Sequence, residues 1–162
     1  MKEEYEQRVA KAVEYFMNGY GCCQSVVAAF ADIYGFTTKQ ALQIGAGFGG
    51  GVGKLRMMCG AVSGLVVLAG MECGDYEGSD REGKAECYKV VQGLIEQFSR
   101  SNGSIICAEL LGLKGPLPKG DYMPSERTRQ YYRVRPCVAK VECAARIFAG
   151  YLDNQNNKNI LV

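Results

Sequence analysis

The 162-residue chain contains no histidine. Histidine is the side chain that most readily changes charge near neutral pH, and it is the commonest metal ligand in proteins. Its absence excludes a cysteine–histidine nucleophile and a histidine-ligated Rieske cluster. Without a C-x-x-C-H sequence, covalently attached haem is excluded as well. Proton and metal chemistry must therefore rest on other side chains.

A strong excess of charge and a long apolar segment are also absent. The 19 basic and 17 acidic residues are spread along the chain and give a net charge of +2, which argues against a surface for nucleic acid or an anionic membrane. The longest apolar run, residues 61–71, is far shorter than the roughly 20 residues of a membrane span. The polar start does not resemble a signal peptide. We expect a cytoplasmic protein with no nucleic-acid partner and no membrane insertion.

Cysteine, by contrast, is abundant, with 8 residues of this type in the chain. A chain of this length with 48% hydrophobic residues can bury a core without disulfide staples. Thiols are mostly kept reduced in the cytoplasm. The cysteines therefore indicate metal or redox use more than a disulfide framework. Packing is the alternative for any one of them, because an unpaired cysteine behaves as a small hydrophobe.

Apolar residues recur at helical spacing along most of the chain, and no segment alternates with a period of two. The pattern predicts an all-α fold, a single-domain bundle of six to seven helices over residues 1–152. The Asn-rich residues 153–162 are expected to form a frayed tail. Helices are expected at about residues 3–17, 22–34, 37–44, 59–71, 79–101, 104–111 and 137–151, with a short helical segment at 127–132.

Capping residues predict where several helices begin. Thr37 followed by Gln40, and Ser79 followed by Glu82, have the spacing of a capping box. Ser104 is expected to cap the helix that follows it.

Four cysteines stand just after sequence signals for a helix start: Cys22, Cys59, Cys107 and Cys137. A helix N-terminus carries partial positive charge and unpaired N–H donors, so it favours a thiolate over a thiol. Thiolates are the form that binds metals and exchanges disulfides. The other four do not begin helices, and we assign them no role: Cys23, Cys73, Cys87 and Cys143.

Basic residues flank two of the helix-start cysteines. Lys54 and Arg56 precede Cys59, and Arg133 and Arg135 precede Cys137. These cations would lower the thiol pKa further if they face inward; solvated surface positions are the alternative. No C-x-x-C pair occurs among the cysteines, which argues against a zinc ribbon and a thioredoxin-like motif. A shared site would have to be assembled by tertiary structure.

A glycine-rich loop, residues 45–53 with six glycines, precedes Cys59. It spells G-x-G-x-x-G, but no strand precedes it, so a dinucleotide site is not favoured. We expect its glycines to allow close backbone approach and to direct N–H groups at sulfur, with simple packing against helices as the alternative. The expected cofactor-binding glycines are Gly49, Gly50, Gly51, Gly53 and, beside Cys59, Gly60.

Five segments together resemble the C_GCAxxG_C_C family of redox-active proteins, which is named for its cysteine pattern. They are residues 19–26, 48–53, 59–64 and 103–112, and Cys137 in the last helix. The signature cysteines of the family fall on the same four positions that begin helices. The chain departs from the family at Gly21, where Asn is usual, and in having four further cysteines. A similar cysteine pattern occurs in the iron–sulfur part of split-Soret cytochromes, which implies a cluster by analogy.

These observations leave three hypotheses. The first is a small redox protein in which Cys22, Cys59, Cys107 and Cys137 bind an iron–sulfur cluster for electron transfer with a redox partner protein. The second is a thiol–disulfide redox protein without metal, in which the same cysteines supply the redox thiols. The third is a structural zinc site or a metal-carrying module. Enzymatic activity and a homo-oligomer both stay open.

Overall fold

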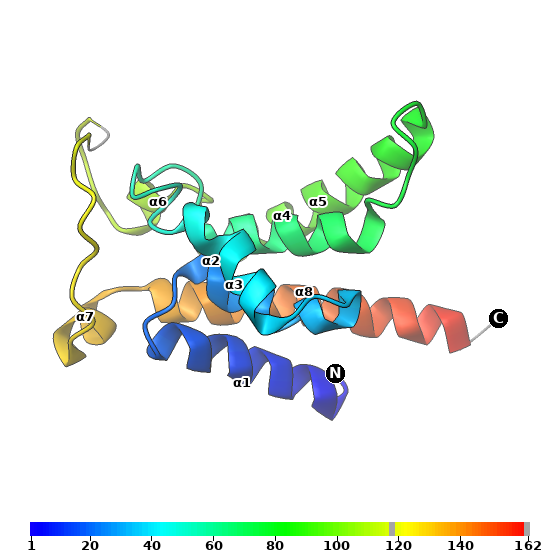
Figure 1. Cartoon of the computed structure of the whole chain (residues 1–162), viewed down its shortest axis with the longest axis horizontal. Coiled ribbons are helices and arrows are strands. Elements are labelled where there is room, and N and C mark those ends of the chain that lie inside the picture. The colour runs from blue at the N-terminus through cyan, green and yellow to red at the C-terminus, as the bar shows by residue number, and fades with distance from the viewer. Residues whose placement is uncertain (117–118, 161–162) are drawn as a thin grey trace.

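The protein is described here by a computed structural model that covers residues 1–116 and 119–160. These residues form helices and no β-strand, so the all-α prediction is confirmed (Figure 1). The helices are α1 (Glu3–Met17), α2 (Cys22–Ala28), η1 (Ala31–Tyr34), α3 (Thr38–Gly45), η2 (Ala46–Phe48), α4 (Gly60–Cys73), α5 (Arg81–Asn102), α6 (Cys107–Leu110), α7 (Arg129–Val134) and α8 (Cys137–Ile160). Eight of these are α-helices, more than the six to seven expected, because the short segment expected at 127–132 forms a helix of its own, α7; η1 and η2 are 3-10 helices.

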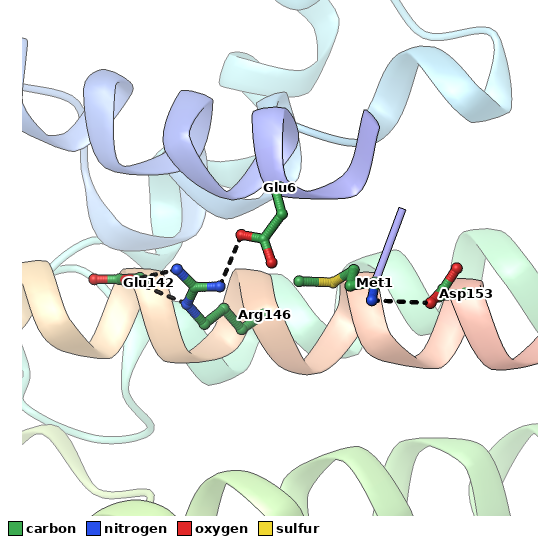
Figure 2. A network of polar contacts seen from close by, with 5 residues as sticks. All are labelled: Met1, Glu6, Glu142, Arg146 and Asp153. Carbon is green, nitrogen blue, oxygen red and sulfur yellow. Dashed lines mark hydrogen bonds and ion pairs between the residues drawn. The ribbon is translucent and has the colours of Figure 1, made fainter. Parts of the chain in front are cut away.

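The first and last helices form an antiparallel pair. Buried residues of α1 recur at helical spacing, from Tyr5 to Phe16, and form one hydrophobic core with Phe148 and Leu152 of α8. Figure 2 shows Arg146 of α8 between Glu6 of α1 and Glu142 on its own helix. Such half-exposed ion pairs contribute little, about 0.5 kcal/mol each. The apolar face therefore holds the pair together.

Helices α2 and α4 pack closely because small residues lie between them. A Cβ atom at Gly64 would lie 2.7 Å from Cβ of Val26, so only glycine fits there. The α4 sequence is apolar on all sides, and eight of its residues are buried. A helix of this kind needs neighbours on several faces, and α4 has them in α2, α5 and α8.

Helices α4 and α5 form a hairpin whose turn projects beyond the rest of the bundle (Figure 1). Asp80 is the N-cap of α5, and its side chain accepts a hydrogen bond from the Gly83 amide at 2.9 Å. The predicted capping box of Ser79 and Glu82 is therefore wrong by one residue. Asp caps a helix as well as Ser does, and the spacing alone did not distinguish them.

Two other helix ends can be compared with expectation. The capping box of Thr37 and Gln40 is confirmed. Ser104 is not the N-cap of α6, since the cap is Ile106; the Ser104 hydroxyl instead accepts a hydrogen bond from the Ile106 amide. Helix α8 was expected to end near Tyr151 and continues to Ile160. Of the expected tail, residues 153–160 belong to α8, and 161–162 lie outside the described residues.

Over the described part of the chain, no helix combines the length and the apolarity that crossing a bilayer requires.

Candidate four-cysteine site

The four helix-start cysteines line one cavity of about 120 Å³. Cys22, Cys107 and Cys137 are the first residues of α2, α6 and α8, and Cys59 is the N-cap of α4. The sequence signals for the starts at Cys22, Cys59 and Cys137 are therefore confirmed, whereas the helix at Cys107 begins without the expected Ser104 cap. Four segments that are distant in the chain bring their cysteines to one place.

A short backbone pairing joins two of these cysteines. Met58 and Ile106 form an isolated antiparallel bridge. The Cys59 amide donates to the Ile105 carbonyl at 2.8 Å, and the Cys107 amide donates to the Met57 carbonyl at 2.6 Å. This pairing holds the starts of α4 and α6 side by side. Hydrogen bonds between distant segments leave no local pattern, so the sequence did not predict it.

Two glycines are fitted closely to the cysteines. A Cβ atom at Gly51 would lie 2.6 Å from Cβ of Cys107, and Gly51 has a φ of +69°. A Cβ atom at Gly60 would lie 3.1 Å from Cβ of Cys22. Both glycines line the cavity, as does Gly50. The expected close approach of backbone to cysteine is thus seen at Gly51 and Gly60.

The remaining expected glycines, Gly49 and Gly53, are not among the cavity-lining residues. Their amides donate to the carbonyls of Ala46 and Gly47, inside the loop. The amides that reach sulfur come from elsewhere: those of Ala61 and Val62, in the first turn of α4, donate to the Cys59 thiol. The helix N-terminus therefore supplies the N–H groups that were expected from the loop.

The loop has an unusual backbone conformation. Three residues other than glycine have positive φ: Val52 at 62°, Lys54 at 66° and Arg56 at 61°. A β-branched residue such as Val52 is rarely found there, because its Cβ crowds the backbone. Strained backbone of this kind is concentrated at functional sites. Here the conformation places Gly51 against Cys107 and turns Arg56 towards the cavity.

The cavity is lined by positively charged side chains. Among the described residues that line it, none is Asp or Glu, and five are basic: Lys54, Arg56, Arg127, Arg135 and Lys140. Nη1 of Arg56 lies 3.8 Å from Sγ of Cys107. Arg56 was expected to act near Cys59 and contacts Cys107 instead. The exposed Arg133, also expected as a neighbour of Cys137, does not line the cavity.

Cys22 and Cys137 form the most strongly interacting pair. A hydrogen bond from the Cys22 thiol lowers the pKa of Cys137 to about 6, and Arg135, Arg127 and Arg56 lower it further against the cost of burial. The same hydrogen bond and burial raise the pKa of Cys22 well above its usual value. At neutral pH the thiolate form of Cys137 is therefore favoured, and it accepts a hydrogen bond from the Cys22 thiol.

Burial dominates at the other two thiols. It raises the pKa of Cys59 to about 11, although the Ala61 and Val62 amides oppose the shift. Burial also raises the pKa of Cys107, with Arg56 opposing it. A lowered thiol pKa is found at Cys137 alone, and there the Cys22 hydrogen bond and the arginines are its cause. Burial outweighs the helix-end charge at Cys59 and Cys107, and at Cys22 the hydrogen bond to Cys137 and burial both favour the neutral thiol.

Arg127 is a site residue that the sequence did not identify as such, and it lies beside Tyr131 in the cavity lining. Arg127 donates hydrogen bonds to the carbonyls of Phe16 and Tyr20, each at 3.1 Å, and its guanidinium lies 4.8 Å from the Tyr131 ring centroid. Arg127 lies in the segment before α7 and is farther in the chain from Cys22, Cys59 and Cys107 than from Cys137. No sequence signal marked it.

Within the described residues, no group of three or more cysteine or carboxylate side chains is arranged to hold a single metal ion.

The fold and the cavity define a class: a small all-α protein in which four cysteines and several arginines surround one buried site. A family model described as "putative redox-active protein (C_GCAxxG_C_C)" matches residues 20–151, and the chain belongs to this redox-active family. No curated protein and no solved structure matches the chain.

Proposed function

We propose that this redox-active protein transfers electrons through an iron–sulfur cluster bound by Cys22, Cys59, Cys107 and Cys137. One observation supports this above all: four cysteines from four helix starts line a single cavity. A thiol–disulfide site needs only two cysteines, so it leaves the other two cysteines of the cavity without a role. Iron–sulfur clusters are commonly held by four cysteine thiolates.

The donor set and the charges at the cavity suit such a group. The four cysteine thiols are the soft ligands among the described lining residues, which include no Asp or Glu. Four thiolates would bring four negative charges into a buried place, which is costly without compensation. Arg56, Arg127 and Arg135 already lower the pKa of Cys137, and they would offset that charge. A bound cluster would supply one-electron transfer.

The remaining residues shape the place that the group would occupy. Gly51 and Gly60 keep the backbone close to Cys107 and Cys22, and the amides of Ala61 and Val62 donate to the Cys59 sulfur. N–H donors at sulfur and positive charge both make reduction of a cluster easier, and limited solvent access does the opposite. The half-buried Tyr131 and the exposed Pro124 line the cavity on the side of α7 and limit access to it.

Purification of the full chain without oxygen, followed by iron and sulfide analysis, tests the proposal. We expect iron and acid-labile sulfide in similar amounts. Oxygen-free protein that carries all four cysteines and no metal would contradict it. Stoichiometric zinc without sulfide would contradict it too, and would support a structural zinc site or a metal-carrying module instead.

A second candidate function is a reversible disulfide between Cys22 and Cys137, and it is favoured by their hydrogen bond. A thiolate beside a neutral thiol is the arrangement used in thiol–disulfide exchange. Mild oxidation should then remove the two thiols of Cys22 and Cys137, measured by alkylation and peptide mass spectrometry, and this loss should disappear at Cys137 in Cys22→Ser. Cys143→Ser, at a half-buried position on α8 outside the cavity, is the control that should keep it.

A further inference from the structure

Two cysteines outside the cavity meet at the far end of α4. Cys73 is the last residue of α4, and Cys87 lies in the second turn of α5. Sγ of Cys73 lies 3.8 Å from the Cys87 carbonyl oxygen, and the Cys87 thiol is near enough to contribute to the raised pKa of Cys73. Neither residue lines the four-cysteine cavity. The hairpin of α4 and α5 therefore holds a second pair of neighbouring thiols.

The pair is accessible from one side only. Cys87 is 6% exposed, while Cys73 is half-buried. The Cys73 thiol also donates to the Ala69 carbonyl at 2.8 Å, which fixes it in the last turn of α4. A small oxidant can therefore reach Cys73 more readily than the buried Cys87.

We propose that Cys73 and Cys87 are a second redox site, which forms a reversible disulfide between α4 and α5 with a small-molecule disulfide as its oxidant. The site is separate from the proposed cluster. Helix α4 rises about 1.5 Å per residue, so its 14 residues place the two sites about 20 Å apart by the same rise. The inference does not depend on what the cavity binds.

The reaction balances as two exchange steps. The Cys73 sulfur, as thiolate, attacks one sulfur of the small disulfide, and the other sulfur leaves and takes up the proton that Cys73 lost. The Cys87 sulfur then attacks Cys73 in this mixed disulfide, releasing the second small thiol with the proton of Cys87. Two protein thiols are oxidised to one disulfide, and one small disulfide is reduced to two thiols.

The bond would stabilise a projecting part of the molecule. The turn between α4 and α5 extends away from the bundle (Figure 1). A disulfide between Cys73 and Cys87 closes the loop through this turn and reduces the freedom of the unfolded chain. Oxidation should therefore raise the melting temperature.

The test uses the full chain equilibrated with oxidised and reduced glutathione, followed by alkylation, trypsin digestion and mass spectrometry. Cys87 is the single cysteine of tryptic peptide 85–89, and Cys73 lies in peptide 57–81. We expect these two peptides to be linked, with a combined mass two hydrogen atoms lower than that of the reduced pair. Excess reduced glutathione should separate them. The linked protein should melt about 5 °C higher than the reduced protein.

Matched variants identify the sulfur atoms. Cys73→Ala should abolish both the link and the melting shift, whereas Cys143→Ala, at another half-buried position, should keep both. Because peptide 57–81 also contains Cys59, a link that persists in Cys73→Ala would overturn the proposal. So would Cys87 that stays alkylatable at every glutathione ratio, or Cys73 that stops at the mixed disulfide. Cys22→Ser should leave the link intact even where it abolishes the proposed cluster.

Discussion

Helix α4 connects two sulfur sites that differ in charge. At its N-terminus, Cys59 joins three other cysteines in a cavity lined by arginine and lysine. At its C-terminus, Cys73 meets Cys87 beside Glu72, and burial, Cys87 and Glu72 raise the pKa of Cys73 to about 12. The helix dipole acts in the same direction, since its positive end is at Cys59 and its negative end at Cys73.

This difference shows that neighbouring thiols alone do not determine reactivity. The Cys22–Cys137 pair lies among arginines that favour a thiolate. At the Cys73–Cys87 pair, Glu72 disfavours one. Thiol–disulfide exchange needs a thiolate. We therefore expect fast exchange at Cys137 in the cavity and slow exchange at Cys73 in the α4–α5 hairpin.

The largest effect is expected when a side chain is forced between the loop and Cys107. Gly51→Ala places a methyl group 2.6 Å from Cβ of Cys107 at positive φ, which should cost about 3 kcal/mol of unfolding free energy. Gly53→Ala is the matched control, since it has positive φ and open space around it, and should cost about 1 kcal/mol. Urea unfolding measures both. Equal losses would show that Gly51 is not fitted to Cys107.

The next effect concerns the segment that closes the cavity. Arg127→Ala removes two hydrogen bonds, one to the Phe16 carbonyl in the last turn of α1 and one to the Tyr20 carbonyl just after it, and should cost about 2 kcal/mol of unfolding free energy. The exposed Arg129 provides the control: Arg129→Ala should change the stability by less than about 0.5 kcal/mol. Urea unfolding should separate the two variants. Identical curves would contradict the anchoring role of Arg127.

The pH dependence of alkylation examines the contrast between the two sites directly. In reduced, metal-free protein, Cys137 should be alkylated with a midpoint near its pKa of about 6. Because the charged form is favoured, reactivity is present above this pH and lost as the pH falls through it. Arg135→Gln should raise the midpoint by about one unit.

Arg133→Gln should leave that midpoint unchanged, since Arg133 is exposed and outside the cavity. Equal midpoint shifts in Arg135→Gln and Arg133→Gln would mean that the net charge of the protein, and not the cavity lining, sets the pKa of Cys137.

The smallest effect is expected at Cys73 and Cys87, the two cysteines of the α4–α5 hairpin. Glu72→Gln removes the carboxylate that raises the pKa of Cys73, so the rate of Cys73 alkylation at pH 9 should rise by less than about tenfold. Asp75→Asn, at an exposed neighbouring position, should leave the rate unchanged. Peptide mass spectrometry after timed alkylation gives both rates. Slower alkylation of Cys73 in Glu72→Gln would contradict the claim that the Glu72 carboxylate raises the pKa of Cys73.

The parts of the site that the sequence predicted are those with local causes. A glycine break, a proline and helical periodicity mark helix starts at Cys22, Cys59 and Cys137, and all three are confirmed. Close packing by glycine was expected and occurs at Gly51 and Gly60. Nothing local separated these from Gly49 and Gly53, because the difference lies in which distant residue comes near.

The parts that were missed depend on tertiary contacts. The pairing of Met58 with Ile106 joins two segments far apart in the chain, and Arg127 reaches the cavity by hydrogen bonds to the end of α1. Cys73 and Cys87 were left without a role, since only the packing of α4 against α5 brings them together. Even the thiol charge depends on tertiary structure, because burial reverses the effect of the helix start at Cys59.

The most direct test of the central claim compares iron and sulfide content across two double variants purified without oxygen. We predict that Cys73→Ala with Cys87→Ala retains the iron and sulfide of the unmodified chain, while Cys22→Ala with Cys137→Ala loses them. Equal retention in both, or equal loss in both with both proteins folded, would contradict the assignment of the redox centre to the four-cysteine cavity.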